Sequence, residues 1–109
     1  MSVAKGKSPE NFETKSKYPD KSEQAMWITL TRQGNTAAFG KIVEKYQRPV
    51  YNLCYRLLGN AVEAEDAAQE IFIRAYTRLE SYDDRRQFST WLFSIAANYC
   101  IDRGNHPSF

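Results

Sequence analysis

The sequence is poor in the residues from which most catalytic and metal sites are built. Its 109 residues include a single histidine, His106, and only two cysteines, Cys54 and Cys100. A lone histidine has no second member for a histidine-based nucleophilic or metal site, and the cysteine spacing fits no zinc motif. The five glycines are isolated, so no glycine-rich phosphate-binding loop is present. We therefore expect a protein that is not an enzyme and needs no cofactor or metal.

Long apolar runs and a strong excess of one charge are also missing. No apolar run approaches the roughly 20 residues that cross a bilayer, and the N-terminus has no hydrophobic signal segment. These features predict a cytoplasmic protein without membrane insertion. Fifteen lysines and arginines against thirteen acidic residues give a net charge of +2, which is small for a protein that binds duplex DNA by charge alone. A nucleic-acid role would therefore need help from a partner.

Apolar residues recur at helical spacing, and no alternating strand pattern occurs. The pattern predicts a short helix near 25–33 that closes at Gly34, and a longer run from Asn35 or Thr36 to about 57. Pro49 lies inside that run, so we expect a kink or a second helix that begins near Arg48. Further helices are predicted over 62–79 and 88–103. The fold class is all-α, a compact bundle of three to five helices with short loops.

The inward faces of the last two predicted helices can be read from the same periodicity. Over 62–79 the apolar side holds Ala64, Ala68, Ile71, Phe72, Ala75, Tyr76 and Leu79, and over 88–103 it holds Trp91, Leu92, Ile95, Ala96 and Tyr99. Cys54 and Cys100 lie beside apolar neighbours in helical patterns. We expect two reduced thiols in or near the core, with a disulfide or a redox sensor as the alternative.

A second stripe on the 62–79 helix carries the first functional signal. At spacings of three and four it holds Glu63, Asp66, Glu70 and Ile73, flanked by Gln69. Carboxylates near a helix N-terminus are stabilised by the helix dipole, which accounts for Glu63 and Glu65. The dipole accounts poorly for Glu70, which we expect to form an ordinary surface pair with Arg74, and it does not explain Ile73.

The stretch from Tyr82 to Trp91 mixes aromatic, basic and amide side chains. This combination is used to stack unpaired bases and hold the adjacent phosphates; its members are Tyr82, Arg85, Arg86, Gln87, Phe88, Ser89, Thr90 and Trp91. The alternative is that Phe88 and Trp91 anchor the final helix in the core while the arginines are solvated; for Phe88 the core interpretation is favoured. Asn98 lies two helical turns beyond Trp91 and extends this side of the helix.

Four segments together resemble conserved region 2 of the extracytoplasmic-function (group IV) sigma factors of bacterial RNA polymerase. The segments are 38–43 with Tyr46, then 57–60, then 64–75, and finally 88–98 with 101–103. The resemblance covers about residues 25–103 and implies a sigma region 2 domain over 23–103. We expect residues 1–22 to be a disordered N-terminal tail. Family members carry a second helical domain, so we expect 104–109 to be a C-terminal tail or a truncation point.

The resemblance implies a role for each surface. Asp66, Gln69, Glu70 and Ile73 would dock on the clamp coiled coil of the polymerase beta-prime subunit. The loop and the start of the last helix, with Trp91 and Asn98 near the melting point, would recognise and melt the promoter minus-ten element by capturing flipped non-template bases, for transcription initiation. An anti-sigma protein is a further expected partner. The alternative is a sigma-like interaction module that acts mainly through an anti-sigma protein and does not open DNA.

Overall fold

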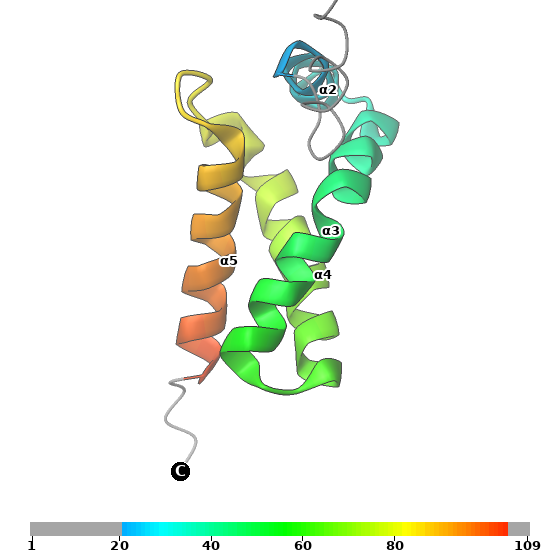
Figure 1. Cartoon of the computed structure of the whole chain (residues 1–109). Coiled ribbons are helices and arrows are strands. Elements are labelled where there is room, and N and C mark those ends of the chain that lie inside the picture. Colours follow the sequence, from blue (N-terminus) through cyan, green and yellow to red (C-terminus); the bar gives the residue numbers. More distant parts are fainter. Residues whose placement is uncertain (1–20, 105–109) are drawn as a thin grey trace, which may run out of the picture. The chain divides into compact units, whose positions relative to one another are not determined.

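The computed structural model describes residues 21–104, which contain four α-helices, one short 3-10 helix and no strand (Figure 1). These elements are α2 (Lys21–Arg32), α3 (Thr36–Leu58), α4 (Ala61–Thr77), η1 (Leu79–Ser81) and α5 (Phe88–Gly104). The prediction of an all-α fold with three to five helices is confirmed. The chain divides between Lys45 and Tyr46, inside α3, into two compact units.

The first unit contains α2 and the first turns of α3. The end of α2 is stabilised by a Schellman motif, in which Asn35 N–H donates to the Leu30 carbonyl (3.0 Å) and Gly34 N–H to the Thr31 carbonyl (2.9 Å). Gly34 has φ +100°, a left-handed conformation that favours glycine. Asn35 then caps α3, because its Oδ1 accepts from Ala38 N–H at 3.1 Å. Both signals were predicted from the sequence.

The start of α2 differs from the expected domain boundary. Lys21 and Ser22, assigned to the tail in the sequence analysis, form the first turn of α2. Residues 1–20 of the predicted tail, and 105–109 of the predicted C-terminal segment with His106, lie outside the described residues. In this unit the buried side chains come from both helices: Trp27, Ile28, Thr31, Ala38, Phe39 and Ile42.

The α3 helix continues through Pro49 without a break, so a second helix starting near Arg48 is wrong. Proline has no N–H and leaves the Lys45 carbonyl without its usual helical donor. On either side of this point the helix is held by apolar burial, because Ile42, Val50 and Cys54 are fully buried. Burial of one apolar side chain contributes about 1.5–3 kcal/mol, which offsets the lost hydrogen bond.

The second unit is a three-helix arrangement made by α3 from Tyr46 onward, α4 and α5 (Figure 1). Gly59, with φ +73°, ends α3, and Asn60 caps α4 by accepting from Glu63 N–H at 2.9 Å. This tight turn reverses the chain, so α4 runs back along α3, and α5 then runs back along α4 (Figure 1). The core between the helices is made of small and branched side chains, among them Val50, Ala64, Ala67, Ile71, Ala75, Leu92 and Ala96.

The buried faces of α4 and α5 differ from the predicted ones at several positions. Ala67 is fully buried in place of Ala68, and Tyr76 is exposed. On α5, Ile95 and Tyr99 are only half-buried, and Cys100 takes a full core position. Small side chains such as Ala67 fit where helices approach closely, and the apolar periodicity alone does not fix which of two adjacent alanines is buried.

Cys54 and Cys100 are both buried as free thiols, which confirms the predicted reduced core cysteines. Burial, and to a smaller extent a hydrogen bond with Cys100, raises the pKa of the Cys54 thiol from 9.0 to about 12. A thiol with so high a pKa is a poor nucleophile at neutral pH.

Among the helices that the structure describes, none combines the length and the apolar character that a membrane span requires.

Candidate functional site

The outer face of α4 carries the predicted stripe. Glu63, Asp66 and Gln69 are exposed, Glu70 is half-buried and Ile73 is 57% exposed. Asn60 fixes the start of the helix, so the register of these side chains is set by the cap. An exposed isoleucine beside several carboxylates makes a surface that suits a partner with both apolar and basic groups.

Two arginines already contact the carboxylates of this face. Arg103, from the last turn of α5, lies 2.9 Å from Glu63 Oε1 and 3.3 Å from Asp66 Oδ2 through its Nη2. Arg74 Nε donates to Glu70 Oε2 at 3.2 Å, which confirms the pair expected from the sequence. The negative charge of the α4 face is therefore partly neutralised within the domain.

The aromatic ring of Tyr99 lies next to both arginines. The Arg74 guanidinium carbon is 4.8 Å from the ring centroid, and that of Arg103 is 5.9 Å away. Arg103 Nη1 also donates to the Tyr99 hydroxyl at 3.2 Å. Cation–π contacts of this kind hold a guanidinium in place while leaving its N–H groups free for carboxylates.

A shallow hollow of about 300 Å³ lies where α4 begins and α5 ends. It is lined by Val62, Glu63, Glu65, Asp66, Gln69 and Arg103. Glu65 has no ion pair within residues 21–104, so the hollow contains uncompensated negative charge beside the Arg103 pairs. Within the described chain, no group of three or more histidine, cysteine or acidic side chains is placed to hold a metal ion.

The polar loop between η1 and α5 is held by its own hydrogen bonds. Arg85 makes a bidentate pair with Asp83, at 3.1 Å from Nε to Oδ1 and 2.9 Å from Nη2 to Oδ2. Arg85 N–H also donates to Asp83 Oδ1, and Arg86 N–H donates to the Asp83 carbonyl. The Arg85 guanidinium holds the pKa of the Asp83 carboxyl below its usual range.

The aromatic residues of this stretch form a buried cluster beneath the loop. Phe88 is 1% exposed, and its ring centroid is 5.3 Å from that of Tyr82 and 5.5 Å from that of Trp91. Tyr82 is 7% exposed and donates its hydroxyl to the Arg86 carbonyl, and Trp91 is 9% exposed. Phe88 is thus a core anchor, as the favoured interpretation held, and the rings of Tyr82 and Trp91 are buried with it.

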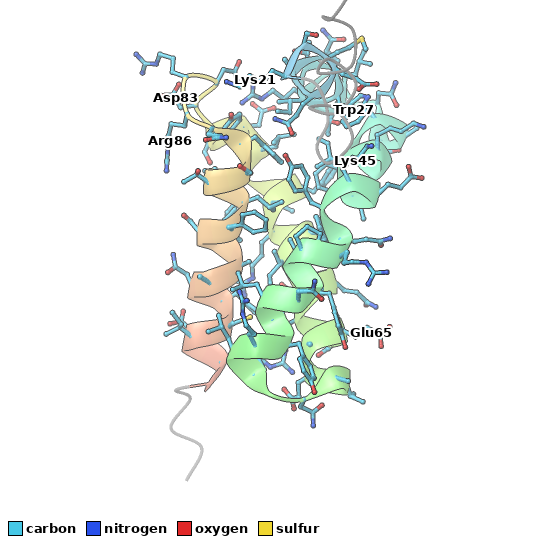
Figure 2. All side chains as sticks on the ribbon, in the orientation of Figure 1. Lys21, Trp27, Lys45, Glu65, Asp83 and Arg86 are labelled. Atoms are coloured by element: carbon cyan, nitrogen blue, oxygen red, sulfur yellow. The ribbon has the colours of Figure 1, made fainter. Side chains whose placement is uncertain are left out.

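The polar members of the predicted DNA-contacting set lie at the surface. Arg85, Arg86, Gln87, Thr90 and Asn98 are exposed and Ser89 is half-buried. Figure 2 shows Asp83 and Arg86 on the loop at one end of the second unit, and Glu65 toward the other end of α4. The acidic face and the polar loop therefore occupy different parts of the same three-helix unit.

Comparison with known proteins identifies the family. Residues 42–104 match sigma-70 region 2. The chain belongs to the sigma-70 region 2 family. It is 54% identical over 76 residues to the ECF RNA polymerase sigma factor SigW of Bacillus subtilis, covering 70% of this chain and 41% of that protein. It is 39% identical over 84 residues to the RNA polymerase sigma-H factor of Pseudomonas aeruginosa, covering 73% and 44%.

A solved structure has the same fold as this region 2 domain. It is the NMR structure of an engineered region 2 of sigmaE in complex with GTAAAA, with a TM-score of 0.69 and 33% identity over 80% of this chain and 94% of that chain. The resemblance to region 2 of the extracytoplasmic-function sigma factors is thereby confirmed. The chain spans less than half the length of the curated relatives it matches.

In this region 2 domain, the sequence analysis missed Arg103 and Tyr99 as parts of the acidic face. Arg103 is 37 residues from Asp66, and a basic residue in the last turn of a helix is already explained by the helix dipole. The antiparallel return of α5 along α4 brings the two together. No sequence signal separates Arg103 from an ordinary basic C-terminal residue.

Proposed function

We propose that this domain docks on core RNA polymerase through α4 and recognises the promoter minus-ten element through the η1–α5 loop and α5, as a step in transcription initiation. The observation that carries the proposal is the region 2 match over 42–104, which includes both surfaces. Sigma factors are non-enzymatic initiation factors, so the domain acts by binding alone. We also propose a cytoplasmic location, because that is where bacterial polymerase works.

The polymerase-binding surface in this proposal consists of Asp66, Gln69, Glu70 and Ile73. Its accessibility supports the assignment, since Asp66 and Gln69 are exposed, Glu70 is half-buried, and the exposed Ile73 adds apolar area next to them. The proposed partner element is the clamp coiled coil of the beta-prime subunit, whose basic side chains would complement the carboxylates. Long-range attraction between opposite charges would raise the association rate.

The DNA-binding surface consists of the polar residues that border the buried aromatic cluster. Arg85 and Arg86 would contact phosphates, and the amides of Gln87 and Asn98 with the hydroxyls of Ser89 and Thr90 would contact base edges. Tyr82, Phe88 and Trp91 support this surface from below in the free domain. Capture of a flipped base costs a few kcal/mol of unstacking, which contacts of this kind must repay.

The DNA-binding test measures fluorescence anisotropy of a labelled single-stranded GTAAAA oligonucleotide, which is the ligand in the similar solved structure. A scrambled oligonucleotide is the control, and both are titrated with the domain in the presence and absence of B. subtilis core polymerase. We expect sequence-dependent binding that is stronger with the core enzyme. Arg86→Ala and Asn98→Ala should weaken it, whereas Arg56→Ala, an exposed α3 arginine without an ion pair in the described chain, should not. Equal binding of both oligonucleotides would contradict the DNA assignment.

The docking test is the affinity for core polymerase of Glu70→Lys against Glu44→Lys, an exposed α3 glutamate that carries the same charge reversal. We expect Glu70→Lys to abolish binding without unfolding the domain and Glu44→Lys to retain it. If docking and sequence-dependent DNA binding both fail, the remaining function is that of an interaction module for an anti-sigma protein.

A further inference from the structure

We infer that Arg103 is a built-in competitor for the acidic face of α4: it occupies carboxylates that a basic partner side chain would bind, and docking displaces it. The inference rests on the proposed function, because it concerns the same face. It goes further by predicting that the domain weakens its own affinity for a basic partner through one named side chain.

The geometry of the ion pairs supports competition. A single Nη2 atom of Arg103 lies within 3.3 Å of both Glu63 and Asp66, so one guanidinium partly neutralises two carboxylates. Asp66, whose side chain is 68% exposed, belongs to the proposed docking set. A lysine or arginine of a partner that approached Asp66 would meet the positive charge of Arg103 within the same hollow, and like charges at that distance repel.

The exposure of Asp66 and Glu63 lowers the cost of displacing Arg103. Their side chains are 68% and 49% exposed, so breaking the pairs leaves neither carboxylate buried and uncompensated. Exposed pairs of this type contribute little to stability. Arg103 can therefore leave the two carboxylates at little cost in stability.

Tyr99 provides a second position for Arg103 after displacement. Its ring lies 5.9 Å from the guanidinium carbon and its hydroxyl accepts from Nη1 at 3.2 Å, whereas the carboxylates are bound by Nη2. The two sets of contacts use different nitrogen atoms, so the Tyr99 contact can persist when the carboxylates change partner. Arg103 need not be fully released into solvent for a basic group to bind Asp66.

The test is the Kd of the full chain for B. subtilis core polymerase, with Arg103→Gln and Arg103→Met as neutral replacements. We expect both to bind about two- to fivefold more tightly, the effect of one exposed ion pair. Arg103→Lys should return the affinity to that of the unchanged chain. The matched control is Arg56→Gln, which removes the same charge from an exposed position without an ion pair in the described residues and should change Kd by less than about 1.5-fold at 0.15 M salt.

The salt dependence of Kd is a second measurement. If Arg103 only stabilised the fold, its replacement would not make polymerase binding more sensitive to salt. The neutral variants should lose affinity more steeply with salt than the unchanged chain, because their face is more negative. Weaker or unchanged binding by both neutral variants, or equal tightening by Arg56→Gln, would overturn the inference. Asp66→Lys distinguishes the docking proposal from the competition by Arg103. Loss of polymerase binding by this variant supports docking through α4, whatever the Arg103 variants show. Unchanged binding by this variant would reject docking through α4 itself.

Discussion

Replacement of Phe88 by alanine tests whether the cluster under the η1–α5 loop is core or binding surface. The ring is 1% exposed and lies 5.8 Å from Tyr46, 5.3 Å from Tyr82 and 5.5 Å from Trp91, measured between centroids. Truncation of a buried phenylalanine costs about 3–5 kcal/mol. A domain of this size has a total unfolding free energy of about 5–15 kcal/mol, so Phe88→Ala removes a large part of it.

The measurement is urea unfolding at 25 °C, followed by circular dichroism at 222 nm. With an m value of about 1–3 kcal/mol/M, a loss of 3 kcal/mol moves the midpoint by at least about 1 M. Phe88→Leu, which keeps most of the apolar area and loses the ring contacts, should cost about 1–2 kcal/mol and remain folded. Thr90→Ala, an exposed neighbour on the same helix, should stay within about 0.5 kcal/mol.

The result that would refute the reasoning is a loss below about 1 kcal/mol for Phe88→Ala together with a loss of DNA binding. That outcome would mean that the ring contributes to the binding surface and little to the core. The opposite outcome, large destabilisation with DNA binding retained by Phe88→Leu, would identify Phe88 as a support for the loop.

Four further predictions concern the turn between α3 and α4 and the core thiols. Asn60→Ala should lower the free energy of unfolding by about 1 kcal/mol in urea titrations, because α4 loses its cap; an unchanged midpoint would reject the cap. Gly59→Ala at φ +73° should cost about 1–2 kcal/mol, and a gain would mean that the turn is not left-handed. The pKa of Cys54 is raised from 9.0 to about 12 in the folded state. Between these two pH values the folded protein keeps the Cys54 proton, whereas the unfolded chain loses it. The free energy of unfolding should therefore fall as pH rises from about 9 to 12. The pH slope should be shallower in Cys54→Ala, and both cysteines should react with a thiol reagent at pH 8 only after unfolding; rapid labelling of the native protein would contradict their burial.

The local features of the fold were predictable because their causes are local. Gly34 ends α2 in a left-handed conformation and Asn35 caps the next helix, as expected from the sequence, and Gly59 and Asn60 act in the same way between α3 and α4. Helical periodicity likewise indicated that the acidic stripe of α4 would face outward, since an apolar stripe on the opposite side had to be buried. Each of these signals spans only a few residues of sequence.

The features that were not predictable depend on contacts between distant segments. Whether α3 would continue through Pro49 depended on how well the residues around it are buried. The burial of Tyr82 in a polar loop depended on the rings of Phe88 and Trp91 beneath it. The pairing of Arg103 with Asp66 exists only because α5 returns along α4, and no spacing rule relates two residues that are 37 positions apart. The sequence by itself thus determines the helices and the chemistry of their exposed faces. The packing of the helices determines which of the exposed charges are already paired. The reason is that an ion pair needs two side chains within a few ångströms, and for residues far apart in the sequence only tertiary contacts bring them that close.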